Sequence, residues 1–267
     1  MWINVLVGAI CGTVAAMIAH LVVSKLTTNK NAVQIVTIVL MVALFGISKA
    51  TVVPHIKTWN ELRNVDGELS KNVAFSALKE HDPEEYKRII DGLKAVIESG
   101  GTQQDAVLAV RGLIEQVVKQ RLPIASDAAV SQYMRAMVKE MKELKAKDPA
   151  LCHRFLFPEP GNNIDLQKHV SAQTMSEDLA GLASVVRSSA TSPTTPPTEA
   201  EVSDDLTAVM MELYGTYGED IMALENPAAV RIPSDRLCQI TIDMYDKILA
   251  LPEEKSGPLL RYMLNQA

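Results

Sequence analysis

The first 54 residues constrain the fold most, because they contain two long stretches that are almost free of charged side chains. Residues 2–23 carry no charge, and residues 32–53 carry only Lys49. A helix of roughly 20 apolar residues, rising about 1.5 Å per residue, spans the hydrocarbon core of a bilayer. A short polar loop separates the two stretches. The sequence therefore predicts a transmembrane helical hairpin over 1–54 that contacts the lipid bilayer through both stretches.

A cleaved secretory signal is the alternative for this segment. Lys25 and Lys30 precede the second stretch, and Ser48-Lys49-Ala50 has the small-x-small pattern of a cleavage site. The first stretch fits a signal poorly, because it lacks a cationic residue before its apolar part. The hairpin is the preferred interpretation.

Charge divides the chain at the same place. The whole sequence has 26 basic and 32 acidic residues and a net charge of −6. Residues 1–54 hold three lysines and no acidic residue, so the remainder has 23 basic against 32 acidic residues, a net charge of −9. A nucleic-acid partner would need a basic surface and aromatic rings that stack on bases. Residues 55–267, which we call the body, are instead acidic, and only 4% of the chain is aromatic. Nucleic acid is therefore excluded as a partner.

Small residues recur at four-residue spacing in the first apolar stretch, at Gly8, Gly12 and Ala16. This spacing lets two membrane helices approach closely. The pattern predicts a helix-packing face, either for the second helix of the hairpin or for a second copy of the chain, which would make a homo-oligomer.

The side of the membrane on which the body lies depends on two observations. The lysines of the loop at 24–31 favour a cytoplasmic loop and an external body, whereas the basic residues after the second stretch favour the reverse. Cys152 and Cys238 are the only cysteines after residue 54, and such a pair suggests a disulfide in an oxidising compartment. Two buried free thiols are the alternative. We expect a bacterial-type inner membrane, with the body on its extracytoplasmic (periplasmic) side.

The sequence pattern predicts an all-α fold, in which the hairpin is followed by a multi-helix bundle formed by the body. Asp82-Pro83 and Asp148-Pro149 are helix starts, Gly100-Gly101 is a helix stop, and Ser126 caps a helix that runs to about residue 147. Further helices are expected in five parts of the chain, at 164–187, 200–217, 220–226, 234–250 and 257–266.

The longest non-helical stretch divides the body into parts. Residues 188–200 are rich in Ser, Thr and Pro, which predicts a linker or long loop. The expected organisation is a helical domain at 55–187, this linker, and a C-terminal subdomain at 201–267 packed on the helical domain.

Catalytic signatures are absent from the sequence. It contains no HExxH, GxSxG, phosphate-loop or CxxC motif. Cys152-His153 are adjacent on a helix and so point about 100° apart, which does not suit a nucleophile and its base. Asp165 and His169, four residues apart, could hold a metal with His153 as a third ligand, but they are equally consistent with a surface hydrogen-bonded pair. We predict no catalytic residue, metal site or cofactor, and an enzyme without a recognisable motif is the least favoured function.

Two groups of side chains are candidates for binding a partner. Met134, Met137 and Met141 form a helical stripe that fits either core packing or an adaptable peptide groove. Tyr214 and Tyr217, three residues apart, could anchor a partner or simply end a helix at Gly218.

These observations predict a membrane-anchored accessory protein that acts by binding another protein in a membrane-associated, secretion-related complex. A membrane-held inhibitor or immunity-type protein that neutralises a basic toxin is the second hypothesis, because the body is acidic.

Overall fold

The computed structural model describes residues 64–157, 164–225 and 232–266. Every regular element in these ranges is helical, which confirms the all-α bundle. The predicted membrane hairpin, with Gly8, Gly12 and Ala16, lies outside them. Within the described ranges, no helix combines the length and the apolar character that crossing a bilayer requires.

The described helices follow one another with short connections. They are α3 (Val73–His81), α4 (Pro83–Glu98), α5 (Gln103–Arg121), η1 (Leu122–Ile124), α6 (Asp127–Lys147), α7 (Pro149–Leu156), α8 (Leu166–His169), α9 (Ala172–Thr191), α10 (Glu199–Tyr217), η2 (Gly218–Leu224), α11 (Ser234–Ala250) and α12 (Glu253–Gln266).

The described chain falls into two compact units. The smaller includes 64–66 and 93–106, and the larger contains 67–92 and the described residues from 107 onward. In the smaller unit, Gly100 takes a φ of 75° at the end of α4, a conformation that suits glycine. The Asp105 carboxylate then accepts hydrogen bonds from the backbone N–H and the hydroxyl of Thr102, both at 2.7 Å, which starts α5.

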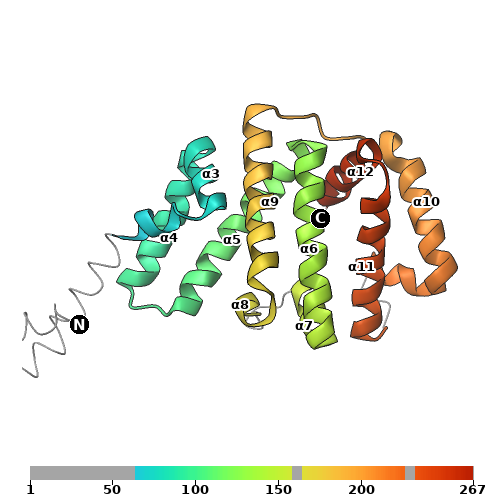
Figure 1. The fold of residues 1–267 in the computed structure, drawn as a ribbon, viewed down its shortest axis with the longest axis horizontal. Coiled ribbons are helices and arrows are strands. Elements are labelled where there is room, and N and C mark those ends of the chain that lie inside the picture. The colour runs from blue at the N-terminus through green and yellow to red at the C-terminus, as the bar shows by residue number, and fades with distance from the viewer. Residues whose placement is uncertain (1–63, 158–163, 226–231, 267) are drawn as a thin grey trace, which may run out of the picture. The chain divides into compact units, whose positions relative to one another are not determined.

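Helix α6 is the centre of the larger unit. It packs against α7, α9, α11 and α12, and Figure 1 shows it standing between α9 and α11. Its fully buried side chains include Val130, Met141 and Leu144. The core of this unit is therefore built around one helix that is covered on several sides.

Two glycines bring neighbouring helices unusually close to α6. A Cβ added at Gly181 of α9 would lie 2.7 Å from Cα of Tyr133, and one added at Gly257 of α12 would lie 2.7 Å from Cα of Asp127. At Gly257 the Cβ and Cγ of Asp127 would lie closer still, at 2.1 and 2.4 Å. Because Cα and Cβ do not move when a rotamer changes, a side chain could be accommodated at either glycine only by moving the backbone. The two crossings fix α9 and α12 against α6.

The predicted helix at 164–187 is interrupted, because α8 ends at His169 and α9 begins at Ala172. Ser171 caps α9, and Glu143 of α6 adds a second cap. The Glu143 carboxylate accepts hydrogen bonds from the Ser171 N–H at 2.5 Å and from the Thr174 hydroxyl at 2.6 Å. The break therefore has a local signal, the Ser171 cap, and a second contact that comes from α6.

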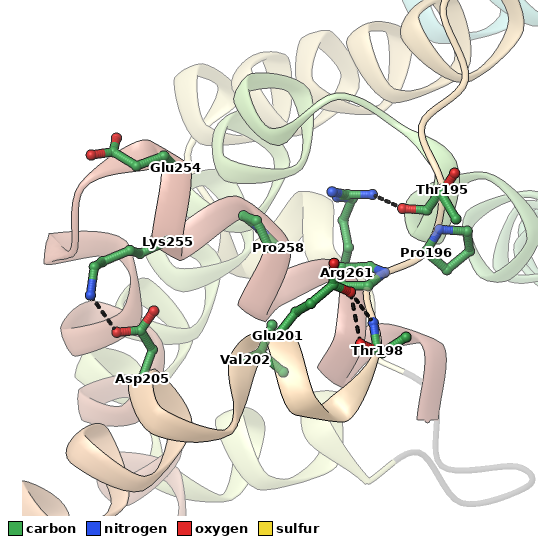
Figure 2. Close-up of a pocket in the computed structure, with 11 residues that line it drawn as sticks. Thr195, Pro196, Thr198, Glu201, Val202, Asp205, Glu254, Lys255, Pro258 and Arg261 are labelled. Atoms are coloured by element: carbon green, nitrogen blue, oxygen red, sulfur yellow. Dashed lines mark hydrogen bonds and ion pairs between the residues drawn. The ribbon is translucent and has the colours of Figure 1, made fainter.

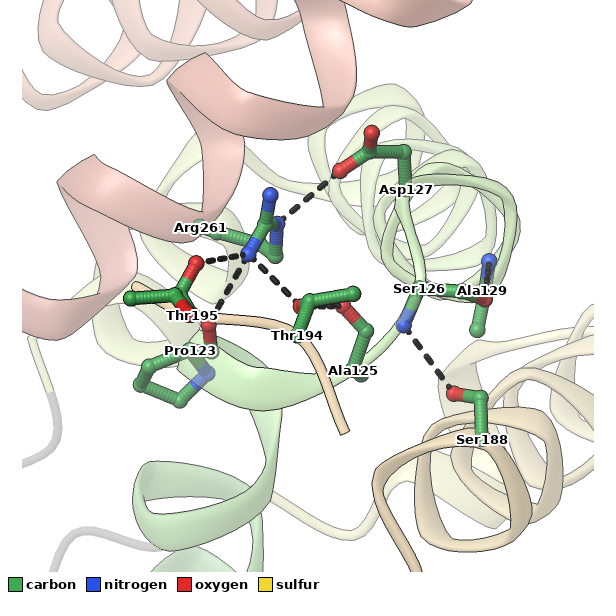
Figure 3. A network of polar contacts seen from close by, with 9 residues as sticks. All are labelled: Pro123, Ala125, Ser126, Asp127, Ala129, Ser188, Thr194, Thr195 and Arg261. Atoms are coloured by element: carbon green, nitrogen blue, oxygen red, sulfur yellow. Dashed lines mark hydrogen bonds and ion pairs between the residues drawn. The ribbon is translucent and has the colours of Figure 1, made fainter. Parts of the chain in front are cut away.

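The segment at 192–198, which we call the strap, joins α9 to α10 and is held to the bundle. The Thr194 N–H donates to the Ile124 carbonyl at 2.8 Å, and its hydroxyl donates to the Ala125 carbonyl at 2.9 Å. Arg261 of α12, only 6% exposed, donates to the Thr194 hydroxyl at 2.7 Å and to the Thr195 carbonyl at 2.8 Å (Figure 3). The same guanidinium pairs with Asp127 at 2.9 Å. The Thr/Pro-rich stretch is thus a bonded part of the larger unit.

Gly181→Ala should destabilise the larger unit by about 1–3 kcal/mol, because the new methyl group forces α6 and α9 apart. Thermal unfolding of the purified full-length chain, followed by circular dichroism at the helical band, measures the effect. Gly215→Ala is the matched control: a Cβ there meets nothing within 4 Å, so this variant should gain up to about 1 kcal/mol from helix propensity. Equal melting temperatures for the two variants would contradict the close crossing.

Candidate functional site

The two cysteines of the body come together in the structure. Cys152 of α7 and Cys238 of α11 form a disulfide, with their Cα atoms 6.1 Å apart and 86 positions between them in the sequence. Both residues are 0% exposed. The bond joins two helices that also pack on each other, and it leaves Cys152 no free thiol for catalysis.

The methionine stripe on α6 belongs to the core. Met134 is 4% exposed and Met141 is 1% exposed, and Met137 is a partly buried neighbour of the same cluster. These side chains are covered by helices of the chain itself. Of the two interpretations of the stripe, the burial therefore favours packing, and Met134 and Met141 offer no groove to a partner.

The two tyrosines at the end of α10 have different environments. Tyr214 is 56% exposed. Tyr217 turns toward α11, where its hydroxyl donates to Asp243 and its ring lies 5.3 Å from the Arg236 guanidinium. Burial and the neighbouring Asp243 carboxylate raise the pKa of Tyr217 to about 12. Only Tyr214 is available to a partner.

The large exposed apolar side chains are concentrated in α10 and η2, two elements that pack together. They are Met211 and Tyr214 of α10 and Met222 of η2, with exposures of 70%, 56% and 50%. We call the surface of α10 and η2 that carries them the α10 edge, because α10 stands at the edge of the bundle in Figure 1. The other two large apolar side chains that are exposed in the described chain, Val73 and Leu108, are on α3 and α5.

The α10 edge is strongly acidic. Residues 199–225 contain no Lys or Arg and eight acidic residues, namely Glu199, Glu201, Asp204, Asp205, Glu212, Glu219, Asp220 and Glu225. Ion pairs tie three of them to the rest of the bundle: Asp205 to Lys255, Glu212 to Lys247, and Asp220 to Arg236. Subtracting these three from eight leaves five carboxylates of the segment outside ion pairs. Glu219 and Glu225 are close to Met222 in the sequence, whereas Glu199, Glu201 and Asp204 lie in the first two turns of α10.

A groove of about 470 Å³ lies at the other end of α10, between the strap and α12 (Figure 2). All but one of its charged side chains are engaged with one another or with the backbone. Lys255 pairs with Asp205 at 2.7 Å, the Glu201 carboxylate accepts from the Thr198 N–H at 2.8 Å, and Arg261 is held by the strap. The exception is Glu254, which forms no hydrogen bond or ion pair with the described residues.

Two acidic side chains lie in the interface between α6 and α9. Glu140 is 3% exposed, and burial, together with the nearby Asp178 and Glu143 carboxylates, raises its pKa to about 8. Burial raises the pKa of Asp178 to about 6, and its buried Oδ1 has no hydrogen-bond partner among the described residues. Tyr133, whose pKa burial and the same two carboxyls also raise, completes the cluster. The groove between the strap and α12 is not lined by any of these three residues.

The candidate metal ligands of the sequence do not form a metal site. Asp165 pairs with Lys168 at 2.9 Å, and the His153 ring packs 5.2 Å from that of Phe157. Within the described ranges, no group of three or more potential ligand side chains could hold a metal ion.

Sequence reasoning identified Tyr214 but missed Met211 and Met222. The buried positions of α10 are Val202, Val209 and Leu213, and Met211 lies off that stripe, which only the packing of the bundle reveals. A large apolar residue on the polar side of a helix is a marker of a binding surface.

No protein-family model matches the chain. Comparison with curated proteins and with solved structures gives no match either. Function is therefore inferred from the chain's own residues and their contacts.

The buried carboxyls predict an unusual dependence of stability on pH. The pKa of Glu140 is above its ordinary value of 4.5, so the folded chain binds more protons than the unfolded chain, and stability falls as pH rises from about 4.5 to about 8. Glu140→Gln should remove much of this fall and stabilise the chain at pH 8 by roughly 1–3 kcal/mol. Melting temperatures of variant and parent between pH 5 and pH 9 measure it, and parallel profiles would contradict it.

Glu143→Gln is the control, one turn away on the same helix. Hydrogen bonds from Thr174 and Ser171 lower the pKa of Glu143, so its stabilising effect is present at neutral pH and is lost as pH falls through that lowered pKa. This variant should therefore be less stable than the parent at pH 7, with a difference that shrinks in acid.

Proposed function

We propose that this chain is a membrane-anchored accessory protein that binds another protein through the α10 edge, in a membrane-associated and secretion-related assembly. The hairpin at 1–54 attaches the chain to the bilayer, and the bundle presents the binding surface. An enzymatic function gains no support from Cys152, which is bonded to Cys238, or from the groove between the strap and α12, which Glu140 and Asp178 do not line.

The observation that carries the proposal is the exposure of Met211, Tyr214 and Met222 within one short stretch of chain. A well-packed bundle gains free energy by burying such side chains, at about 25 cal/mol for each Å² of apolar surface. Clustered exposed apolar residues with a polar border mark protein-binding surfaces. Tyrosine and methionine are both enriched in such interfaces.

An external location for the body is supported by the Cys152–Cys238 disulfide. Structural disulfides persist in oxidising compartments and are rare in the cytosol. We therefore propose that the body lies on the periplasmic side of a bacterial-type inner membrane, with the loop at 24–31 in the cytoplasm.

Photo-crosslinking in cells tests the binding surface. A photo-reactive phenylalanine analogue in place of Tyr214 should capture a discrete protein, because this side chain would be buried by the partner. The same analogue in place of Arg187, which is exposed on α9, is the control and should capture none. Equal capture from both positions, or none from Tyr214, would contradict a role for the α10 edge.

Thiol labelling of intact cells tests the location. Arg187→Cys places a reactive thiol on the surface of α9, while Cys152 and Cys238 are bonded and buried. The third cysteine, Cys11, is within the proposed membrane-spanning stretch at 2–23 and is replaced by Ser in both parent and variant. A membrane-impermeant maleimide added to cells with a permeabilised outer membrane should label this variant and leave the parent unlabelled. Labelling that needs lysis of the inner membrane would place the body in the cytoplasm.

The acidity of the α10 edge also suits the second hypothesis, a membrane-held inhibitor of a basic toxin. Deletion of the gene has a different effect under each function. Loss of an accessory subunit should lower the levels of the other proteins in its complex, whereas loss of an inhibitor should make cells sensitive to one toxin.

A further inference from the structure

The α10 edge combines exposed apolar side chains with carboxylates, and this combination favours one class of partner. We infer that it binds a cationic amphipathic helix, whose apolar face covers Met211, Tyr214 and Met222 and whose basic residues lie against the surrounding carboxylates. This inference rests on the proposed function and specifies the class of partner for the same surface.

The acidic residues of α10 and η2 determine the sign of the charge that a partner must carry. After the ion pairs with Lys247, Lys255 and Arg236, the segment at 199–225 keeps five negative charges. An acidic segment would be repelled by these carboxylates, whereas Lys and Arg would be attracted and steered to the surface. An anionic membrane surface is disfavoured for the same reason.

Helix geometry determines the shape of the partner. Ala208, Met211 and Gly215 follow each other at spacings of three and four, so they lie on one face of α10, and all three are exposed. A Cβ added at Gly215 would meet nothing within 4 Å, so open space lies above the helix backbone there. Small residues on either side of Met211 let a second helix approach closely, and flexible methionines adapt to its side chains. A helix laid along this face would cover the large apolar residues of α10.

The test uses the full-length chain in phosphatidylcholine nanodiscs and three synthetic peptides. The first is an amphipathic helix of Lys and Leu, the second has the same composition in scrambled order, and the third replaces Lys with Glu. Binding is measured by fluorescence anisotropy of the labelled peptide, with empty nanodiscs subtracted. We expect saturable binding of the first peptide only, weakened at least roughly fivefold when salt rises from low to high ionic strength.

Two sets of variants connect the binding to the surface. Met211→Ala and Tyr214→Ala should each weaken it about tenfold, as expected for central interface residues. Leu108→Ala, which removes an exposed apolar side chain elsewhere in the described chain, should leave it unchanged. Asp204→Asn combined with Glu219→Gln should weaken binding and reduce its dependence on salt.

Each other outcome overturns the inference in a distinct way. Equal binding of the scrambled peptide would mean attraction by charge alone, and equal binding to empty nanodiscs would mean lipid as the ligand. Binding that is insensitive to Met211→Ala and Tyr214→Ala would place the site elsewhere. If no peptide binds but photo-crosslinking from position 214 captures a protein, the proposed function stands and the cationic class of partner is wrong.

Discussion

The larger unit depends on the close approach of helices to α6. Gly181 and Gly257 allow α9 and α12 to cross it at backbone contact, and these two crossings set the positions of everything that those helices carry. α9 leads into the strap, and α12 supplies the Arg261 that holds the strap down. The strap in turn determines where α10 starts. The position of the α10 edge therefore depends on the helix contacts made at α6.

Local chemistry predicted the helix boundaries well where the cap belongs to the helix itself. Ser126 before α6 and Asp148 before α7 accept hydrogen bonds from the first turn of their own helices, as their positions in the sequence suggested. Ser171 before α9 is a cap of the same kind, since it accepts from the Thr174 N–H, and the prediction of one helix over 164–187 overlooked it. The Glu143 carboxylate, which reaches Ser171 from another helix and is 28 residues distant in the chain, adds a contact that local pattern does not show.

The candidate site was predicted in part, for a similar reason. Tyr214 is next to a helix end and was recognisable from its neighbours, whereas the exposure of Met211 depends on which face of α10 the rest of the bundle covers. Met134 and Met141 of α6 are also methionines on a helix, yet they are buried whereas Met211 is exposed. Tertiary packing decides whether a methionine faces the core or the surface. A stripe of apolar residues on a helix does not tell how many faces of that helix its neighbours cover.

The disulfide also has a topological consequence. Cys152 and Cys238 close a covalent ring that contains α8, α9, the strap, α10 and η2. The α10 edge therefore belongs to the ring rather than to a free arm of the chain. A protease that cuts once at any point within the ring leaves both pieces joined through the sulfurs. The binding surface would stay attached to the N-terminal part of the chain until the bond is reduced.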